Sequence, residues 1–377
     1  MRGRTRGLGP AVLGVALGLA AGLFDAEALW IPAAGLVLLW ALVAGALWVA
    51  ARGARVEREL GAARVVEGEP LVVRVRARAG RLRLAGGELV AIPGPHPQEA
   101  PAARLAPGRG GVAGEVALSF PRRGRVTLPP AELRLVDALG LGVRTVSGGE
   151  GDDLLVLPRV EPVRSLAAGG GLLRGGEDGA HTAPGAESEI DGLRPYREGT
   201  PATRIHWPAL ARGAGLVERR MLPEAERLPL VALDAGRGAD RDALDAAVRA
   251  TASLAVALAA RGGCAVLLPG DRRPTSLEPA LLAWPGLHAR LALVEPGPSL
   301  GLGGHAHRHR TLVLVCARVP TRPPVALTAG PRGARLLVVP GTWGSAPPVL
   351  AVAGCHGYAL GATSGRVADP VREAVLS

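Results

Sequence analysis

The sequence predicts a multidomain α+β protein with an N-terminal transmembrane helical hairpin, a small β-sandwich and a C-terminal α/β domain. Three observations lead to this prediction. Two long uncharged apolar runs open the chain, short alternating segments separated by glycine and proline follow, and strand-like and helix-like patterns alternate from residue 228 onward. With 377 residues the chain has room for two or three domains, and it needs no disulfides to hold a core together.

The composition excludes several classes of protein. The formal net charge is +11, and all 44 basic residues are arginine, which indicates a compositional bias rather than a nucleic-acid surface. Aromatic residues make up only 3%, too few for a base-stacking surface, so we expect no specific nucleic-acid partner. Cys264, Cys316 and Cys355 are odd in number and far apart, which excludes a disulfide scaffold and a CxxC zinc site.

Residues 1–58 are expected to form two transmembrane helices with cytoplasmic flanks. The apolar runs Leu8–Phe24 and Leu29–Ala51 have 17 and 23 residues. As helices they would be about 25 and 35 Å long, against a hydrocarbon core of about 30 Å. Arginines flank the outer ends and the connecting turn carries only acids, so the positive-inside rule predicts a two-pass protein with both termini and the main domains in the cytoplasm. The alternative is a signal peptide cleaved near Ala26-Glu27-Ala28.

Three glycines mark one face of the first helix. Gly14, Gly18 and Gly22 recur every four residues, and small residues allow two membrane helices to approach closely. We expect this face to pack within the hairpin, against the second helix near Gly35 and Gly45. The alternative is that it joins copies of the chain in a homo-oligomer.

Residues 59–164 are expected to form the β-sandwich. From Leu71 to Arg78 apolar and basic residues alternate with period two, so Val73, Val75 and Ala77 should face a core. Short strands are also expected at residues 81–84, 114–120, 125–128, 132–136, 143–146 and 154–157. The arginines at positions 74, 76, 78, 81 and 83 form either a solvated strand face or a surface for anionic lipid, an acidic partner or nucleic acid.

Residues 165–227 combine a glycine-rich linker with a motif that gathers aromatic and basic residues in a chain poor in aromatics. Arginine planes stack on tyrosine and tryptophan rings, and guanidinium groups bind carboxylates such as Glu187, Glu189 or Glu218. The motif therefore predicts either a clamp that fixes the linker to the next domain or a surface that docks a partner. The residues of this candidate site are Arg194, Tyr196, Arg204, Trp207 and Arg212.

At this motif the chain resembles the bacterial domain-of-unknown-function 58 family. The residues that match the family's signature are Arg194, Tyr196, Gly199, Arg204, Trp207, Ala211 and Arg212. The segments Arg122–Val126 and Asp137–Leu141 resemble two further elements of that family, R-R-G-x-Y and D-P-F-G-L. The sequence departs from the family pattern at Thr200, Val126 and Ala138–Leu139, which should loosen local packing without changing the fold.

Residues 228–377 alternate between strand and helix patterns, which is typical of a parallel sheet covered by helices on both faces. Strands are expected at 228–233, 264–268, 311–317, 335–339 and 349–353. One helix, capped by Asp240, should run to Arg261, and a second, bent or broken at Pro285, should run from Leu277 to Val294. The pattern is similar to the von Willebrand factor A-like (Rossmann-type) domain that the family resemblance implies.

The resemblance also implies the position of a possible metal site. Von Willebrand factor A domains often bind Mg²⁺ through a D-x-S-x-S motif, where this chain has Asp234-Ala235-Gly236-Arg237-Gly238. Both serines are replaced by glycine, and Arg237 competes electrostatically for Asp234, so we expect a degenerate remnant and no metal. His305, His307 and His309 alternate like some zinc ligands, but the arginines beside them favour an ordinary polar loop.

The sequence carries no enzyme signature. A P-loop needs a lysine, which this chain lacks, and neither G-x-S-x-G nor H-E-x-x-H occurs. We therefore expect a non-enzymatic adaptor at the inner membrane, in contact with membrane lipid and without a cofactor. The resemblance implies a MoxR-type AAA+ ATPase as partner, in protein maturation or cell-envelope assembly. The alternatives are a basic scaffold for anionic lipid or nucleic acid, and a degenerate hydrolase that uses Cys264, Cys316 or His206.

Overall fold

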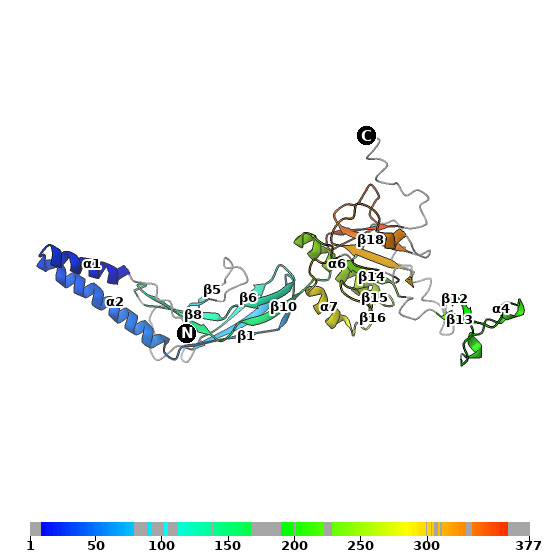
Figure 1. The fold of residues 1–377 in the computed structure, drawn as a ribbon. Helices are drawn as coiled ribbons and strands as arrows, with labels where there is room; N and C mark the ends of the chain where they lie inside the picture. Colours follow the sequence, from blue (N-terminus) through cyan, green and yellow to red (C-terminus); the bar gives the residue numbers. More distant parts are fainter. Residues whose placement is uncertain are drawn as a thin grey trace, which may run out of the picture. The chain divides into compact units, whose positions relative to one another are not determined.

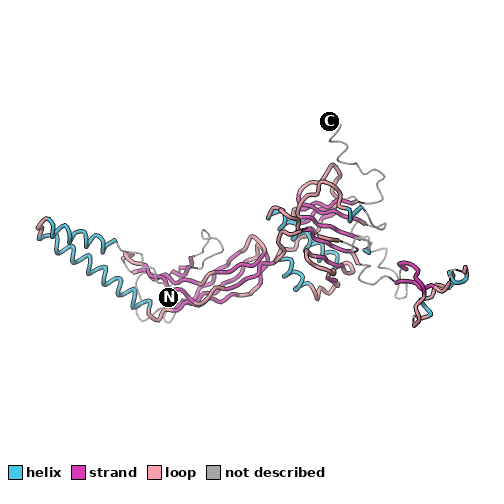
Figure 2. The backbone as a smooth tube through the Cα atoms, in the orientation of Figure 1, coloured by secondary structure: helices cyan, strands magenta, loops and turns pink. Residues whose placement is uncertain are grey.

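The computed structural model describes residues 9–78, 89–91, 102–104, 112–137, 139–166, 190–199, 201–213, 215–221, 228–298, 300–302, 304, 308–309, 311–328 and 334–360. These residues form a mixed α+β fold with apolar helices near the N-terminus and several sheets (Figures 1 and 2). The chain divides into two compact units, Met1–Leu157 and Pro158–Ser377. The prediction of a mixed α+β chain that opens with an apolar helical segment is confirmed.

The first unit opens with two helices that pack against each other, α1 (Gly9–Leu23) and α2 (Trp30–Ala51), joined by the short helix η1 (Glu27–Leu29). By length and composition, the segment Glu27–Ala51 is able to cross a membrane, whereas Gly9–Leu23 is a shorter apolar helix. Both helices expose large apolar side chains to their surroundings, which is unusual for a protein surface in water. These side chains are Val12, Leu13, Val15, Leu19, Leu23, Trp30, Ile31, Val37, Leu38, Leu42 and Trp48.

Gly14 allows α1 and α2 to come close together. A Cβ atom at this position would lie 2.9 Å from Val37 Cγ2 and 3.0 Å from the carbonyl oxygen of Ala33. The prediction that this face packs within the hairpin is confirmed, but its partners differ from those expected. Among the described residues, a Cβ at Gly35 or Gly45 meets nothing within 4 Å.

Three small sheets make up the β part of the first unit. The first contains β1 (Arg55–Leu60), β3 (Pro70–Arg78) and β6 (Val112–Ser119), and the second contains β2 (Arg64–Val66), β10 (Asp152–Leu157) and β7 (Gly124–Leu128). The third contains β5 (Ala102–Arg104), β4 (Leu89–Ala91), β8 (Ala131–Val136) and β9 (Val143–Gly148). Buried and exposed residues alternate strictly along β3, as its sequence predicts. The segment 81–84, predicted as a strand, lies outside the described residues.

The C-terminal half of α2 belongs to the core of this β domain. Leu47 and Ala50 are fully buried in one apolar cluster with strand residues such as Val73 and Leu133. A Cβ atom at Gly142, next to β9, would lie only 2.7 Å from Leu47 Cδ1. Residues 52–54 connect α2 to β1 without a long linker, and Ala54 is itself buried. Helix and domain therefore form one folded unit.

The second unit contains an eight-stranded sheet. Its central strands are parallel: β15 (Cys264–Leu267), β14 (Leu230–Asp234), β17 (Leu312–Cys316) and β18 (Arg335–Pro340). The flanking strands join through antiparallel pairings: β16 (Thr275–Leu277) on one side, and β20 (Cys355–Ala359), β19 (Leu350–Val352) and β11 (Arg164–Ser165) in turn on the other. The predicted parallel sheet is thus correct for the four central strands only.

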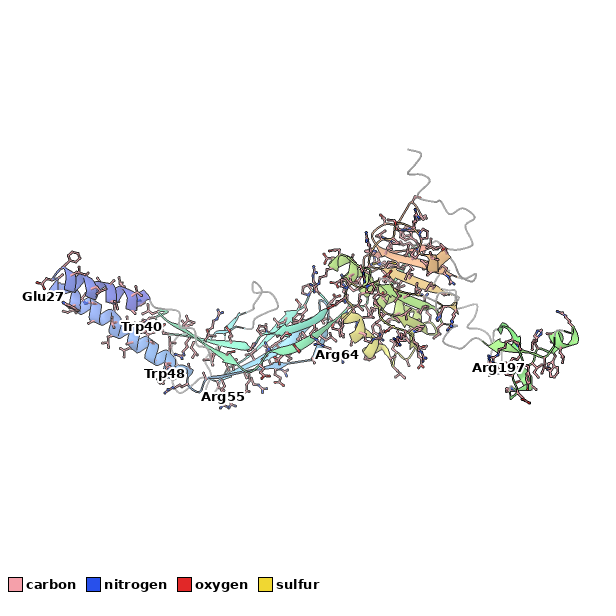
Figure 3. All side chains as sticks on the ribbon, in the orientation of Figure 1. Glu27, Trp40, Trp48, Arg55, Arg64 and Arg197 are labelled. Atoms are coloured by element: carbon pink, nitrogen blue, oxygen red, sulfur yellow. The ribbon has the colours of Figure 1, made fainter. Side chains whose placement is uncertain are left out.

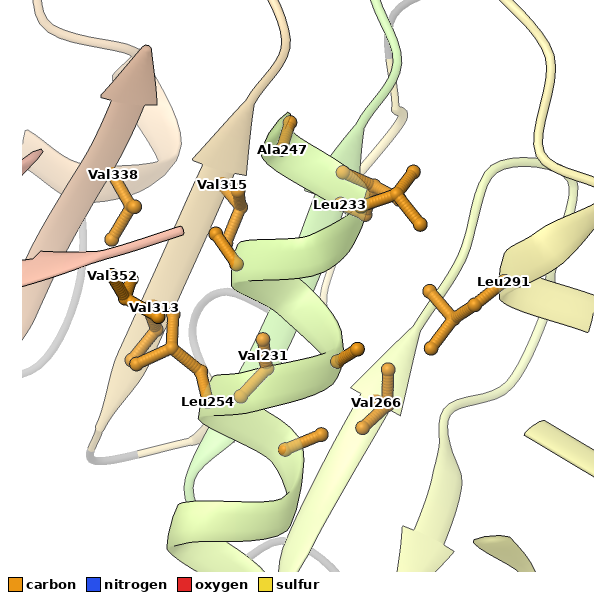
Figure 4. Packing of buried hydrophobic residues seen from close by; sticks show 14 of the residues in the cluster. Val231, Leu233, Ala247, Leu254, Val266, Leu291, Val313, Val315, Val338 and Val352 are labelled. Atoms are coloured by element: carbon orange, nitrogen blue, oxygen red, sulfur yellow. The ribbon is translucent and has the colours of Figure 1, made fainter. Parts of the chain in front are cut away.

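Helices α6 (Arg241–Ala259) and α7 (Trp284–Ala292) supply side chains to the apolar core on one face of this sheet (Figure 4). The other face is covered by the short helix α9 (Val325–Thr328) and by side chains such as Leu302 and Trp343. The predicted helix from Leu277 to Val294, bent or broken at Pro285, is correct only in its second half. Leu277 belongs to β16, and α7 begins at Trp284 because Pro285 fits the first turn of a helix but not its interior.

Candidate functional site

The signature motif folds as a β-hairpin with a helical insert, which we call the hairpin module (described residues between 190 and 221). Strands β12 (Ile190–Pro195) and β13 (Val217–Met221) pair in antiparallel fashion, and η2 (Ala202–Arg204) and α4 (Trp207–Ala211) lie between them in sequence. The backbone N–H of Tyr196 donates to Leu216 O at 3.0 Å, and that of His206 donates to Val217 O at 2.9 Å. These bonds hold the beginning and the middle of the insert against the start of β13.

An ion pair fixes the two strands of the module. Arg194 and Glu218 lie opposite each other, and Arg194 Nε donates to Glu218 Oε1. The side chain of Glu218 is 1% exposed and that of Arg194 is 44% exposed, so the arginine covers a buried carboxylate. A buried carboxylate is costly unless it is paired. Of the three carboxylates considered from the sequence, Glu218 is the one paired here, whereas Glu187 and Glu189 lie outside the described residues.

Local contacts position the insert. Ile205 and Ala209 are buried, and Ile205 forms a bridge with Glu218 in β13. His206 caps α4, because its Nδ1 accepts a hydrogen bond from the N–H of Ala209 at 3.2 Å. The lone pair of Nδ1 is therefore used to stabilise the start of the helix.

The module displays an aromatic side chain among arginines. Trp207 is 55% exposed, and the side chains of Arg204 and Arg212 are exposed at the two ends of the same short segment, whereas Tyr196 is half-buried. The expected stacking of motif arginines on Trp207 or Tyr196 is not seen among the described residues, where Arg52 stacks on Trp48 instead. Exposed tryptophan and arginine side chains are the types that contribute most to protein interfaces.

Two exposed leucines extend this surface and were not predicted. Leu210 and Leu216 are each roughly two-fifths exposed, and Leu210 lies three residues after Trp207 on α4. Residues three apart lie on the same side of a helix, so this spacing is the sequence signal for a continuous apolar patch. Together the described residues offer an apolar surface bordered by fixed positive charge, which suits an acidic and partly apolar protein partner.

Asp234 ends β14 and is occupied by backbone hydrogen bonds. Its Oδ1 accepts from the N–H groups of Gly236 at 3.1 Å and Leu300 at 3.2 Å. Gly236 and Gly238 have φ values of +57° and +72°, so this turn is built for glycine, and a serine at either position would be strained. Among the described residues, no group of three His, Cys, Asp or Glu side chains is placed to hold a metal ion.

The three cysteines are buried in the second unit. Burial, together with the adjacent charge of Asp234, raises the pKa of Cys316 to about 12. Burial likewise raises the pKa of Cys264 and of Cys355 to about 12. These thiols stay protonated at neutral pH, and a thiol is a far weaker nucleophile than a thiolate.

The histidine cluster is described only at its last member. His309 is buried, and its Nδ1 donates to the carbonyl oxygen of Leu228 at 2.8 Å. His309 thus lies in a loop before β17, as expected, but it is buried rather than exposed. His305 and His307 lie outside the described residues.

The arginines of β3 alternate with acids of the neighbouring strands. Arg74 Nε donates to Glu115 Oε1 at 2.7 Å, and Arg76 lies 3.7 Å from Glu59. The hydrogen bond that Arg74 donates to Glu115 raises the pKa of the Arg74 guanidinium. This surface is therefore a mixed-charge strand face rather than a continuous positive stripe.

Only the sequence motifs and this geometry bear on function. No protein-family model matches the chain, and no curated protein or solved structure is significantly similar to it.

Proposed function

We propose that the protein is a membrane-anchored, non-enzymatic adaptor that presents the hairpin module to a protein partner. The single observation that carries this proposal is the exposed Trp207 between the exposed arginines Arg204 and Arg212. By its resemblance to the domain-of-unknown-function 58 family, the partner is a MoxR-type AAA+ ATPase. The pair would then act in protein maturation or cell-envelope assembly.

The positions of the tryptophans in α2 support the membrane anchor. Trp30 and Trp48 are 18 residues apart, which corresponds to about 27 Å of helix, close to the thickness of the hydrocarbon core of about 30 Å. Tryptophans favour the two membrane–water interfaces. Trp48 is followed by Arg52 and Arg55, whereas Glu27 lies near the opposite end of the helix (Figure 3). We therefore place both units of the protein on the cytoplasmic side, with α1 and α2 as a two-pass anchor.

The strand order of the second unit supports a von Willebrand factor A-like domain. Counted from β14, the order β16-β15-β14-β17-β18 reads 3-2-1-4-5, with an antiparallel strand at position 3. This is the arrangement of a doubly wound sheet, in which the order reverses between β14 and β17. Asp234 lies at the carboxyl end of β14, beside this reversal point. In such sheets ligands bind at this edge, so it offers a second surface for the partner.

The alternatives find less support. A hydrolase that uses Cys264 or Cys316 would need a thiolate, and burial raises both pKa values to about 12. His206 in turn uses its Nδ1 as a helix cap. A scaffold for polyanions would need a continuous run of unpaired arginines on β3, yet Arg74 and Arg76 face Glu115 and Glu59. The adaptor remains the function that the geometry supports best.

Affinity purification from native membranes tests this proposal. The tagged full chain is extracted in mild detergent, with and without ATP, and its partners are identified by mass spectrometry. We expect a MoxR-type AAA+ ATPase to be recovered with the wild-type protein, and at least tenfold less of it with Trp207→Ala or Arg204→Ala. Removal of an interface tryptophan or arginine typically costs about 2 kcal/mol or more, which is more than tenfold in affinity.

Arg273→Ala is the matched control, because Arg273 is also an exposed arginine of the second unit but lies outside the hairpin module. This variant should recover the ATPase as well as the wild type does. Absence of any AAA+ ATPase with all four proteins would refute the proposed partner. Equal recovery by Trp207→Ala and wild type would show that the module is not the docking surface.

A further inference from the structure

A tight turn connects β8 to β9 at the side of α2. We call Asp137 and residues 139–142 the β8–β9 turn. The carboxylate of Asp137 organises it, because Oδ1 accepts from Gly142 N–H at 2.6 Å and Oδ2 accepts from Leu139 N–H at 3.0 Å. Asp137 is buried, so its carboxylate is engaged in these two hydrogen bonds and adds no charge to the surface of the turn.

The tip of the turn is apolar and uncharged. Leu139 is 64% exposed, more than Val72, the other exposed large apolar side chain among the described residues 55–157. The residues that follow are Gly140, the half-buried Leu141 and Gly142, none of which carries charge. A leucine held outward by a rigid turn is poorly suited to water and well suited to an apolar phase.

The turn lies beside the C-terminal half of α2. A Cβ atom at Gly142 would be 2.7 Å from Leu47 Cδ1 and 3.1 Å from Val43 Cγ1. Leu47 and Val43 precede Trp48 by one and five residues, which is about 1.5 and 7.5 Å along the helix towards its centre. Trp48 stacks under Arg52, whose Cζ is 3.2 Å from the ring centroid, and such a pair is typical of the membrane–water interface.

The pairing of β1 with β3 supplies a second, independent observation. Along this pair, Glu57 lies opposite Arg76 and Glu59 lies opposite Arg74, so that opposite charges face each other across the two strands. The exception is Arg55, which lies opposite Arg78 at the end of the sheet next to α2. Both arginines are exposed, and opposed like charges destabilise a sheet unless a counter-charge is present. Phosphate headgroups at the membrane surface would provide that counter-charge.

We propose that the β8–β9 turn is a second membrane contact of this protein, in which Leu139 inserts into the lipid next to α2. The inference rests on the proposed anchoring of α2. Its occupant is the bilayer because the turn continues the apolar surface of the helix at the depth of Val43 and Leu47. Arg55 and Arg78 bind the headgroups at the same level. The β domain is thus attached to the membrane at two points rather than one.

Site-directed spin labelling of the full chain in liposomes tests this proposal. The liposomes contain phosphatidylethanolamine and the anionic lipid phosphatidylglycerol, and single labels are placed by Leu139→Cys, Leu42→Cys and Val72→Cys. The three native cysteines are buried and their thiols stay protonated, so an unmutated sample should take up little label. Collision rates with oxygen, which dissolves in lipid, and with a water-soluble nickel chelate report the surroundings of each label.

Leu42, exposed on α2, is the lipid reference, and Val72, exposed towards the other end of β3 from Arg78, is the water reference. We expect the label at position 139 to collide severalfold more with oxygen than with nickel, like the label at 42 and unlike that at 72. If position 139 behaves like 72 while 42 reports lipid, the second contact is refuted and the anchor stands. If position 42 also reports water, the anchor itself is refuted, and this inference with it.

Discussion

At the residue scale, His288 links the start of the second unit to its core. This residue is buried in α7, stacks on Trp284 with ring centroids 4.4 Å apart, and lies with Nε2 2.7 Å from the carbonyl oxygen of Pro158. Because a carbonyl only accepts, Nε2 carries the proton in this bond. Burial lowers the pKa of His288 below its usual value of 6.5, and the hydrogen bond to Pro158 opposes that shift in part.

This pKa predicts a dependence of stability on pH. A histidine whose pKa is lowered by folding is protonated more readily in the unfolded chain, so its contribution to stability is complete above pH 6.5 and is lost as the pH falls towards the lower folded value. We expect the melting temperature of the full chain in detergent to fall between pH 7.5 and 5.5. His288→Gln keeps a donor for Pro158 but does not titrate, so its melting temperature should fall less. Identical pH profiles for the two proteins would contradict this assignment.

Residue-scale features were predictable where they depend on near neighbours. The capping of α6 by Asp240 follows from its place before an amphipathic run, and the structure confirms it. The pairing of Arg194 with a carboxylate was also expected, but the choice of Glu218 was not, because it depends on the register of β12 against β13. The exposure of Trp207 depends on the tertiary fold, so the sequence did not decide between docking and clamping, and it favoured the clamp.

At the element scale, periodicity predicted the strands and helices that have one buried face. β3 and α6 are of this kind. The hairpin of β19 and β20 was missed because its turn, Ala353-Gly354, has φ values of +50° and +79°, a conformation usually signalled by Asn-Gly or Asp-Gly. The chain contains no asparagine, so this signal was absent. β19 therefore ends at Val352, one residue before the end of the predicted strand at 349–353, and its partner β20 was not predicted.

The close packing of α1 on α2 predicts a size limit at Gly14. Gly14→Val should destabilise the helical hairpin by about 1–3 kcal/mol, because the new side chain would collide with Val37 and with the backbone of Ala33. Gly18→Ala is the control, since its Cβ would be in ordinary contact with Ala33 Cβ at 3.9 Å. The measurement is loss of helical circular dichroism in a detergent titration. Equal midpoints for Gly14→Val and Gly18→Ala would show that this face is not tightly packed.

At the scale of the whole molecule, α2 and the β domain share a core. Leu47→Ala should lower the free energy of unfolding of the β domain by about 2–5 kcal/mol, because Leu47 is fully buried among strand residues. Leu42→Ala lies little more than one turn away but is 63% exposed, so it should have a small effect. The measurement is urea denaturation of the full chain in mild detergent. A similar loss for both variants would mean that α2 does not contribute to the domain.

This shared core was not predictable from the sequence. The apolar run of α2 looks alike along its whole length, and hydrophobicity does not distinguish a leucine that faces lipid from one that faces protein. The strand Arg55–Leu60, which carries the chain from the helix into the domain, falls partly in the segment that was expected to be a cytoplasmic flank. The division into compact units reflects contacts between segments far apart in sequence, which a local pattern does not record.

The short connection from α2 to β1 has a mechanical consequence. Residues 52–54 offer little slack, and backbone hydrogen bonds tie Arg52 to Trp48 and Ala54 to Ala51. Because Gly142 also packs against Leu47, α2 and the β domain are held together rigidly and should move as one body. With α2 in the membrane, as we propose, a torque applied to the β domain would reach the bilayer as a change in helix tilt, and thinning or thickening of the bilayer would reorient the domain.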